Sequence, residues 1–137
     1  MHSTVKFNGK LPLVGKNDKG QKTRFDATLD ESFPAKYASP MEVVLESFAA
    51  CSMMDIIIIL KKMKKEIVNL ETGLEAERAE VHPKVFTSIN ARYRLKSPDC
   101  TLDEFNKAIT LSIDKYCSVA AILRGSGCTI AWSSELS

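Results

Sequence analysis

The chain has 137 residues, of which 45% are hydrophobic and 26% charged, a composition that is ordinary for a soluble globular protein with one buried core. The net charge of +2 comes from intermixed acidic and basic residues, and the lysine cluster at residues 60–65 is short and has no aromatic neighbour, which argues against a nucleic-acid-binding surface. We therefore expect a single domain over residues 1–137 that binds no nucleic acid.

The first elements of the chain are short β-type stretches separated by turn residues: TVKF, LPLVG and QKTRFDATL. They predict a small N-terminal antiparallel β-meander. The opening segment MHSTVKFNGK lacks the charged-then-apolar pattern of a secretory signal, so we expect a cytoplasmic protein.

A long helix is predicted from the segment Ser39-Pro40-Met41-Glu42, which has Ser as N-cap, Pro at the first helical position and Glu completing a capping box. We expect this helix to run to about Lys64 and to carry Cys51. Its apolar run is about long enough to cross a membrane, but Glu46 and Asp55 interrupt it, so we expect a buried helix and no membrane contact. Because its middle is apolar on almost every side, one small subunit can hardly cover it, which predicts a two-fold homodimer.

The rest of the chain predicts a β-hairpin, two helices and a strand. Residues 67–97 alternate between apolar and polar positions, as in a β-hairpin. Residues 101–104 form a second capping box, opening a helix that ends near Cys117. Ser118 is then expected to cap a short helix, VAAILR, before a final strand, CTIAWSSEL. The fold class is therefore expected to be α+β.

The chain contains four cysteines: Cys51, Cys100, Cys117 and Cys128. Without an export signal they indicate free, catalytic or metal-binding thiols rather than a disulfide framework. Metal binding is the weaker alternative, because there is no CxxC motif and His2 and His82 lie at no ligand spacing. We expect no metal site, and we expect Cys100 and Cys128 to be structural.

The local sequence predicts different environments for the Cys51 and Cys117 thiols. Cys51 lies about three turns inside its helix, beyond the reach of the helix dipole, and Asp55 one turn further on would raise the pKa of a thiol. A reactive Cys51 therefore needs a cation from elsewhere, and the alternative is a small core residue. Cys117 precedes a helix start, where we expect access to solvent and backbone N–H groups that stabilise a thiolate; a packed residue is the alternative.

Two separate motifs resemble one family. The first is the helix-opening segment at residues 39–45 with Ala49-Ala50-Cys51 and Asp55, and the second is Lys115-Tyr116-Cys117-Ser118-Val119. Both resemble the OsmC/Ohr family of osmotically inducible and organic hydroperoxide resistance proteins, most closely its OsmC-like branch. The resemblance covers essentially the whole chain.

This resemblance implies an OsmC-like α+β subunit in an intertwined homodimer with the cysteine-bearing helices at its centre. It also implies a thiol-dependent peroxidase that reduces organic hydroperoxides. Cys51 would attack the peroxide and become a sulfenic acid, and Cys117 would resolve it as a disulfide. An external dithiol, typically on a lipoylated protein, would reduce that disulfide, and no metal or organic cofactor is implied.

The chain departs from the hydroperoxide-specific branch, which has a Glu directly after the helix-opening Pro and an Arg that holds the thiolate. Met41 occupies the Glu position here, and Glu42 lies on the opposite side of an ideal helix from Cys51. Glu42 would act across the dimer or through a bent first turn, or serve only in the capping box. Arg24 is the candidate cation, with Lys10 in the Arg position of the family.

Two other functions stay open at this stage. An OsmC-like dimer with little or no peroxidase activity would bind a small molecule and keep its cysteines as relics. A long apolar helix against a curled sheet would also suit a hot-dog-like acyl-binding protein.

Overall fold

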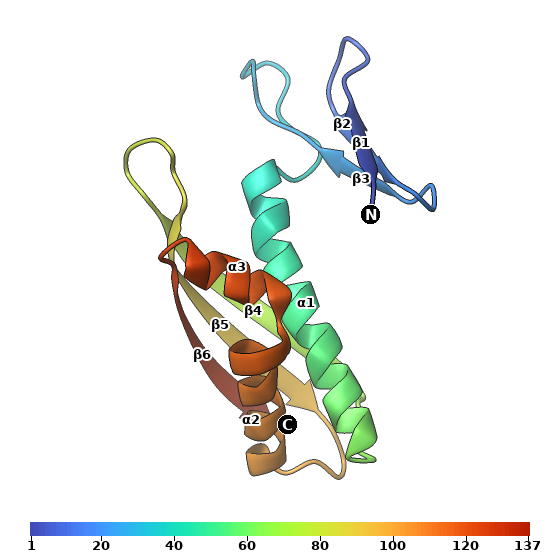
Figure 1. The fold of residues 1–137 in the computed structure, drawn as a ribbon, viewed down its shortest axis with the longest axis vertical. Helices are drawn as coiled ribbons and strands as arrows, with labels where there is room; N and C mark the ends of the chain where they lie inside the picture. Colours follow the sequence, from blue (N-terminus) through green and yellow to red (C-terminus); the bar gives the residue numbers. More distant parts are fainter. The chain divides into compact units, whose positions relative to one another are not determined.

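The computed structural model describes all 137 residues and shows a mixed α+β chain with two three-stranded sheets (Figure 1). Contacts divide the chain into two compact units, Met1–Glu46 and Ser47–Ser137, which are described separately. The α+β class expected from the sequence is confirmed.

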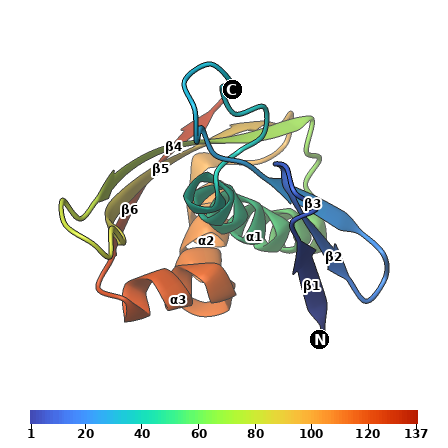
Figure 2. The same cartoon turned by 90° about the horizontal axis from the view of Figure 1, so that it is seen from above.

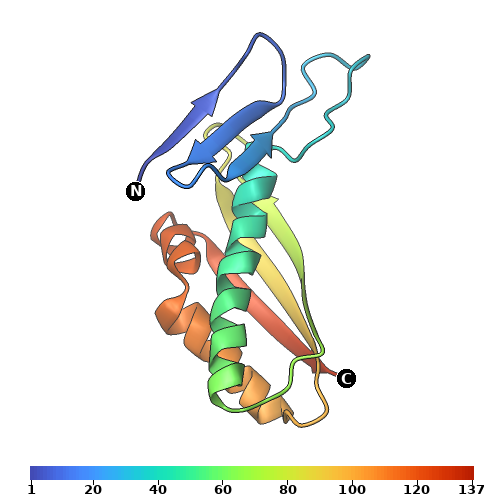
Figure 3. The same ribbon diagram turned by 90° about the vertical axis from the view of Figure 1, so that its right-hand side faces the viewer.

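The first unit contains the predicted β-meander. Strands β1 (Ser3–Lys6), β2 (Leu13–Asn17) and β3 (Lys22–Phe25) pair antiparallel in the order β1-β2-β3 (Figure 3). The turn between β2 and β3 contains Gly20 with a φ of 77°, a left-handed conformation that glycine adopts without steric cost. The three predicted β-type stretches thus form one small sheet.

Helix α1 (Pro40–Lys62) starts where the sequence predicts and ends close to the predicted Lys64. The Glu42 N–H donates to Ser39 Oγ at 3.3 Å, and Ser39 Oγ donates to Glu42 Oε1 at 2.8 Å. The capping-box prediction is therefore only partly right, because the carboxylate bonds to the Ser39 hydroxyl instead of its backbone N–H. Lys64 ends the helix with a φ of 60°.

The second unit is built on a sheet in the order β4-β5-β6. Strands β4 (Asn69–Arg78) and β5 (Phe86–Lys96) form the predicted antiparallel hairpin, and β6 (Thr129–Leu136) pairs parallel to β5. Helix α2 (Leu102–Leu111) starts at the predicted capping box of Thr101. The helices of this unit lie on one side of the sheet (Figure 2).

Apolar side chains from α1, α2 and β5 form the core of the second unit. The fully buried members are Phe48, Ile56, Leu60, Ala91, Tyr93, Phe105, Ala108 and Ile109. The other face of α1 is also apolar but open, since Met54 is 65% and Ile58 52% exposed. By length and composition alone α1 could cross a membrane, but its buried face packs in this core.

The junction between α2 and the last helix differs from the prediction. After α2 the chain makes one π-helical turn, η1 (Ser112–Tyr116), before α3 (Ser118–Gly125). The N-cap of α3 is Cys117 rather than the predicted Ser118, and its sulfur accepts a hydrogen bond from the Ala120 N–H. The Cys117 N–H itself donates to the Ser112 carbonyl at 2.7 Å.

Candidate functional site

Cys51 on α1 and Cys117 at the start of α3 are both free thiols of the second unit. A side-chain hydrogen bond with Cys51 is one cause that raises the pKa of the Cys117 thiol. The charge of Cys51 is a further cause, so the two thiols interact directly. The structure thus brings the two predicted residues together, while their catalytic roles stay predictions.

Cys117 is only 2% exposed, so the expected access to solvent was wrong. Burial is the main cause that raises its pKa to about 11, and the charges of Cys51 and Asp55 add to it. The Ala120 N–H, 3.4 Å from the sulfur, acts in the opposite direction, as expected at a helix start. Desolvation outweighs this hydrogen bond, and Cys117 keeps its proton at neutral pH.

Asp55 lies one turn after Cys51 and is held by a residue of the η1 turn. Ser112 Oγ lies 3.0 Å from Asp55 Oδ2 and 3.1 Å from the Ser52 carbonyl oxygen. Ser112 is completely buried, and its own carbonyl accepts the Cys117 N–H. One residue therefore connects the Asp55 carboxylate to the backbone of Cys117.

A second buried hydrogen bond fixes α1 against β5. Tyr93 is fully buried, and its hydroxyl lies 2.7 Å from Ser52 Oγ. Because Ser52 Oγ donates to the Ala49 carbonyl at 2.9 Å, the Tyr93 hydroxyl is the donor of this pair. Burial raises the pKa of Tyr93 to about 12, so the phenol stays neutral. This contact holds the residue next to Cys51 in place.

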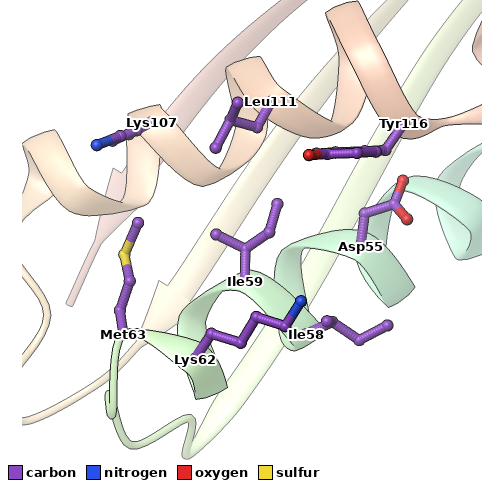
Figure 4. A pocket seen from close by; sticks show the side chains of 8 residues that line it. All are labelled: Asp55, Ile58, Ile59, Lys62, Met63, Lys107, Leu111 and Tyr116. Carbon is purple, nitrogen blue, oxygen red and sulfur yellow. The ribbon is translucent and has the colours of Figure 1, made fainter.

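A cleft of about 490 Å³ runs between α1 and the α2–η1 segment. Its walls are mostly apolar, with Ile58, Ile59, Met63 and Leu111, and they include Lys62 and Lys107. Figure 4 shows Asp55 and Tyr116 at one end of this cleft and Lys107 at the other. Asp55 and Tyr116 are close sequence neighbours of Cys51 and Cys117, although neither cysteine itself lines the cleft.

The two other predicted site residues belong to the first unit. The guanidinium carbon of Arg24 lies 5.7 Å from the centre of the Tyr37 ring, a cation–π contact. Glu42 is engaged with Ser39 at the start of α1. The roles proposed for Arg24 and Glu42 beside a thiolate stay predictions.

The remaining cysteines occupy separate buried positions. The Cys100 and Cys128 thiols donate to the carbonyl oxygens of Thr101 and Thr129. Burial raises the pKa of both thiols, and Glu104 adds to the effect at Cys100. Both are therefore poor nucleophiles at neutral pH. No three histidine, cysteine or carboxylate side chains are grouped in a way that could hold a metal ion.

Sequence reasoning missed Ser112 and Tyr93. Tyr93 had a usable signal, because it occupies a core-facing position in an alternating strand and a buried phenol needs a hydrogen-bond partner. Ser112 had no such signal, since its importance comes from the π-helical turn that only the structure shows.

Comparison with known proteins shows which family and which sequences this chain resembles. The model of a protein family described as OsmC-like protein matches residues 33–133. Protein YhfA of Escherichia coli K12 is 34% identical over 123 residues, which are 90% of this chain and 89% of YhfA.

Two solved structures have the same fold. An OsmC-like protein from Mycoplasma pneumoniae has a TM-score of 0.81 at 19% identity, covering 98% of this chain and 95% of that one. The organic hydroperoxide resistance protein OhrB of Bacillus subtilis has a TM-score of 0.60 at 16% identity, covering 100% and 98%. At these identities the two structures establish the shared fold alone.

Proposed function

Because the chain belongs to the OsmC-like protein family, we propose that it is a thiol-dependent peroxidase that reduces organic hydroperoxides. Cys51 is the attacking cysteine and Cys117 the resolving cysteine. The observation that carries this proposal is the closeness of the two thiols, through which Cys51 raises the pKa of Cys117, because a disulfide can form only between sulfurs that the fold brings together.

The asymmetry of the two thiols supports this assignment of roles. Attack on a peroxide requires a thiolate. With a pKa of about 11, only about one Cys117 in ten thousand is a thiolate at pH 7. Cys51 is only half-buried, whereas Cys117 is 2% exposed, so Cys51 is the thiol of the pair that a peroxide can reach.

The oxidation of the two cysteines to a disulfide requires no oxidant other than the peroxide. The Cys51 thiolate attacks one peroxide oxygen, the O–O bond breaks, and the alkoxide leaves as an alcohol after taking up a proton. Cys117 then attacks the sulfur of the Cys51 sulfenic acid, the S–S bond forms, and water leaves. An external dithiol reduces the disulfide by exchange, and a lipoylated protein is the reductant that we propose.

The cleft suits the organic part of such a hydroperoxide. Its apolar walls contact hydrocarbon, and its volume of about 490 Å³ lies in the range of small-molecule sites. Asp55 and Tyr116 line one end of the cleft, and the proposal places the hydroperoxide group of the substrate at that end.

The proposal includes a homodimer. The open apolar face of α1, with Met54 and Ile58, is a surface that a folded protein normally covers, and a second copy is its simplest cover. Analytical ultracentrifugation at micromolar concentration measures this directly, and a monomer would contradict this part of the proposal.

The experiment that tests the peroxidase treats the reduced protein with about one equivalent of cumene hydroperoxide and maps its disulfides by mass spectrometry. We expect a bridge between Cys51 and Cys117, and we expect Cys117→Ser to accumulate a sulfenic acid that dimedone traps. The double variant Cys100→Ser and Cys128→Ser is the matched control and should behave like the unmodified protein. Free thiols at both Cys51 and Cys117 after exposure would refute the proposal.

The cleft also favours a second candidate, binding of a small apolar molecule without turnover. The same experiment separates the two functions. A pure binding protein keeps both thiols free after peroxide treatment, whereas a peroxidase consumes the peroxide in proportion to the disulfide formed.

A further inference from the structure

The hydrogen bonds of Ser112 show where the site can accept one more proton. Ser112 Oγ lies within hydrogen-bonding distance of two acceptors, the Asp55 carboxylate at 3.0 Å and the Ser52 carbonyl at 3.1 Å. A hydroxyl has one hydrogen, so it cannot fully satisfy both acceptors while Asp55 is ionised. If Asp55 is protonated, its O–H donates to Ser112 Oγ, and the Ser112 O–H donates to Ser52. The network is complete only with that additional proton.

The resolving step releases a proton beside this network. Cys117 is protonated at neutral pH, and its S–H proton must leave when its sulfur attacks Cys51. Ser112 bonds to the Asp55 carboxylate through its hydroxyl at 3.0 Å and to the Cys117 N–H through its carbonyl at 2.7 Å, so the carboxylate and the thiol-bearing residue belong to one hydrogen-bonded group. Tyr93, which bonds to Ser52 in the same region, is a neutral phenol and a poor proton acceptor.

We propose that Asp55 is the proton acceptor of the resolving step. It takes the proton of the Cys117 thiol while the Cys117 sulfur attacks the Cys51 sulfenic acid, and it passes this proton to the departing hydroxide. The S–S bond forms, the S–O bond breaks and one water leaves, so no other reactant is needed. This inference rests on the peroxidase function proposed above.

The substitution Asp55→Asn distinguishes this role from a purely electrostatic one by the sign of its effect. Asparagine keeps the shape of the side chain and can still hydrogen-bond to Ser112 Oγ. If Asp55 acted only through its charge, its removal would ease ionisation of Cys117 and speed up disulfide formation. If Asp55 accepts the proton, its removal slows disulfide formation.

The experiment follows the two steps separately after rapid mixing of the reduced protein with one equivalent of cumene hydroperoxide. Dimedone trapping measures the Cys51 sulfenic acid, and acid quenching with mass spectrometry measures the disulfide. In Asp55→Asn we expect sulfenic acid formation not to be slowed and disulfide formation to fall about 100-fold at pH 7. The rate in the variant should rise about tenfold per pH unit, because only Cys117 thiolate reacts there. The control Asp114→Asn changes an exposed carboxylate of the same π-helical turn and should match the unmodified protein.

An equal or faster disulfide rate in Asp55→Asn would overturn the inference while leaving the peroxidase intact. If the unmodified protein forms neither sulfenic acid nor disulfide, the peroxidase proposal fails and the inference with it. Circular dichroism checks that the variant folds. If it does not, the pH profile of the unmodified protein decides: a disulfide rate nearly constant from pH 6 to 9 supports Asp55, and a tenfold rise per pH unit overturns it.

Discussion

The unfolding free energy of the reduced protein should fall at high pH because Cys117 ionises. The substitution Cys117→Ala should remove this contribution to the fall. In the fold the pKa of this thiol is about 11, above the value of 9.0 for an unperturbed thiol. A raised pKa means that the neutral thiol is the form that the fold favours. Its contribution to stability is therefore complete below about pH 9 and is lost as the pH rises from 9 to 11.

The magnitude follows from the two pKa values. At pH 10 the unfolded thiol is mostly ionised and the folded thiol mostly neutral, so the protein has lost about 1.4 kcal/mol of unfolding free energy relative to pH 7. The substitution Cys117→Ala also removes the sulfur that caps α3, which costs about 1 kcal/mol at pH 7. The unmodified protein should thus be the more stable one at pH 7, and this advantage should disappear near pH 10.

Urea unfolding at pH 7, 8, 9 and 10 in the presence of a phosphine reductant measures this effect. Subtracting the unfolding free energies of Cys117→Ala cancels titrations common to both proteins, including that of Tyr93, whose pKa of about 12 lies above this range. A difference between the two proteins that stays constant from pH 7 to 10 would refute the reasoning. That result would mean that Cys117 is as well solvated in the fold as in the unfolded chain.

Three further variants test separate parts of the structure. Tyr93→Phe removes the buried hydrogen bond to Ser52 and should lower the unfolding free energy by about 1–2 kcal/mol in urea at pH 7; a loss below about 0.3 kcal/mol would contradict this. Replacing Lys62 and Lys107 together by Ala should raise KM about tenfold for a hydroperoxide that carries a carboxylate, with cumene hydroperoxide as the unaffected control substrate. Lys64→Gly should raise the unfolding free energy by about 0.5–1 kcal/mol, because Lys64 has a φ of 60°, and unchanged stability would show that this turn is not strained.

Helix starts and strand patterns could be predicted because local chemistry decides them. The capping box at Thr101 needs only the four residues 101–104, and it forms as the sequence indicates. The alternation in β4 and β5 follows from burial of one sheet face, so it is visible in a single sequence. The pairing of Cys51 with Cys117 was predicted through family resemblance, since nothing local connects two residues on separate elements.

Long-range features could not be predicted in the same way. The segment CTIAWSSEL indicates a strand but carries no information on direction, and the parallel pairing of β6 with β5 follows from the helical crossover between them. The environment of Cys117 was misjudged for a similar reason. The helix start beside it is local and was predicted to within one residue, whereas the burial that dominates its pKa comes from distant parts of the unit.

The π-helical turn η1 connects Cys117 and the Asp55 carboxylate, because both are bonded to its residue Ser112. The Cys117 N–H bonds to the Ser112 carbonyl five residues back, instead of four as in an α-helix. This longer step ends the helix at Cys117, whose φ of −71° and ψ of 106° are extended, so that its sulfur can cap α3. Ser112 at the same time directs its hydroxyl to Asp55 on α1. The proton transfer that we propose needs the thiol and the carboxylate in a fixed relation, and Ser112 bonds to the Cys117 backbone through its carbonyl and to Asp55 through its side chain.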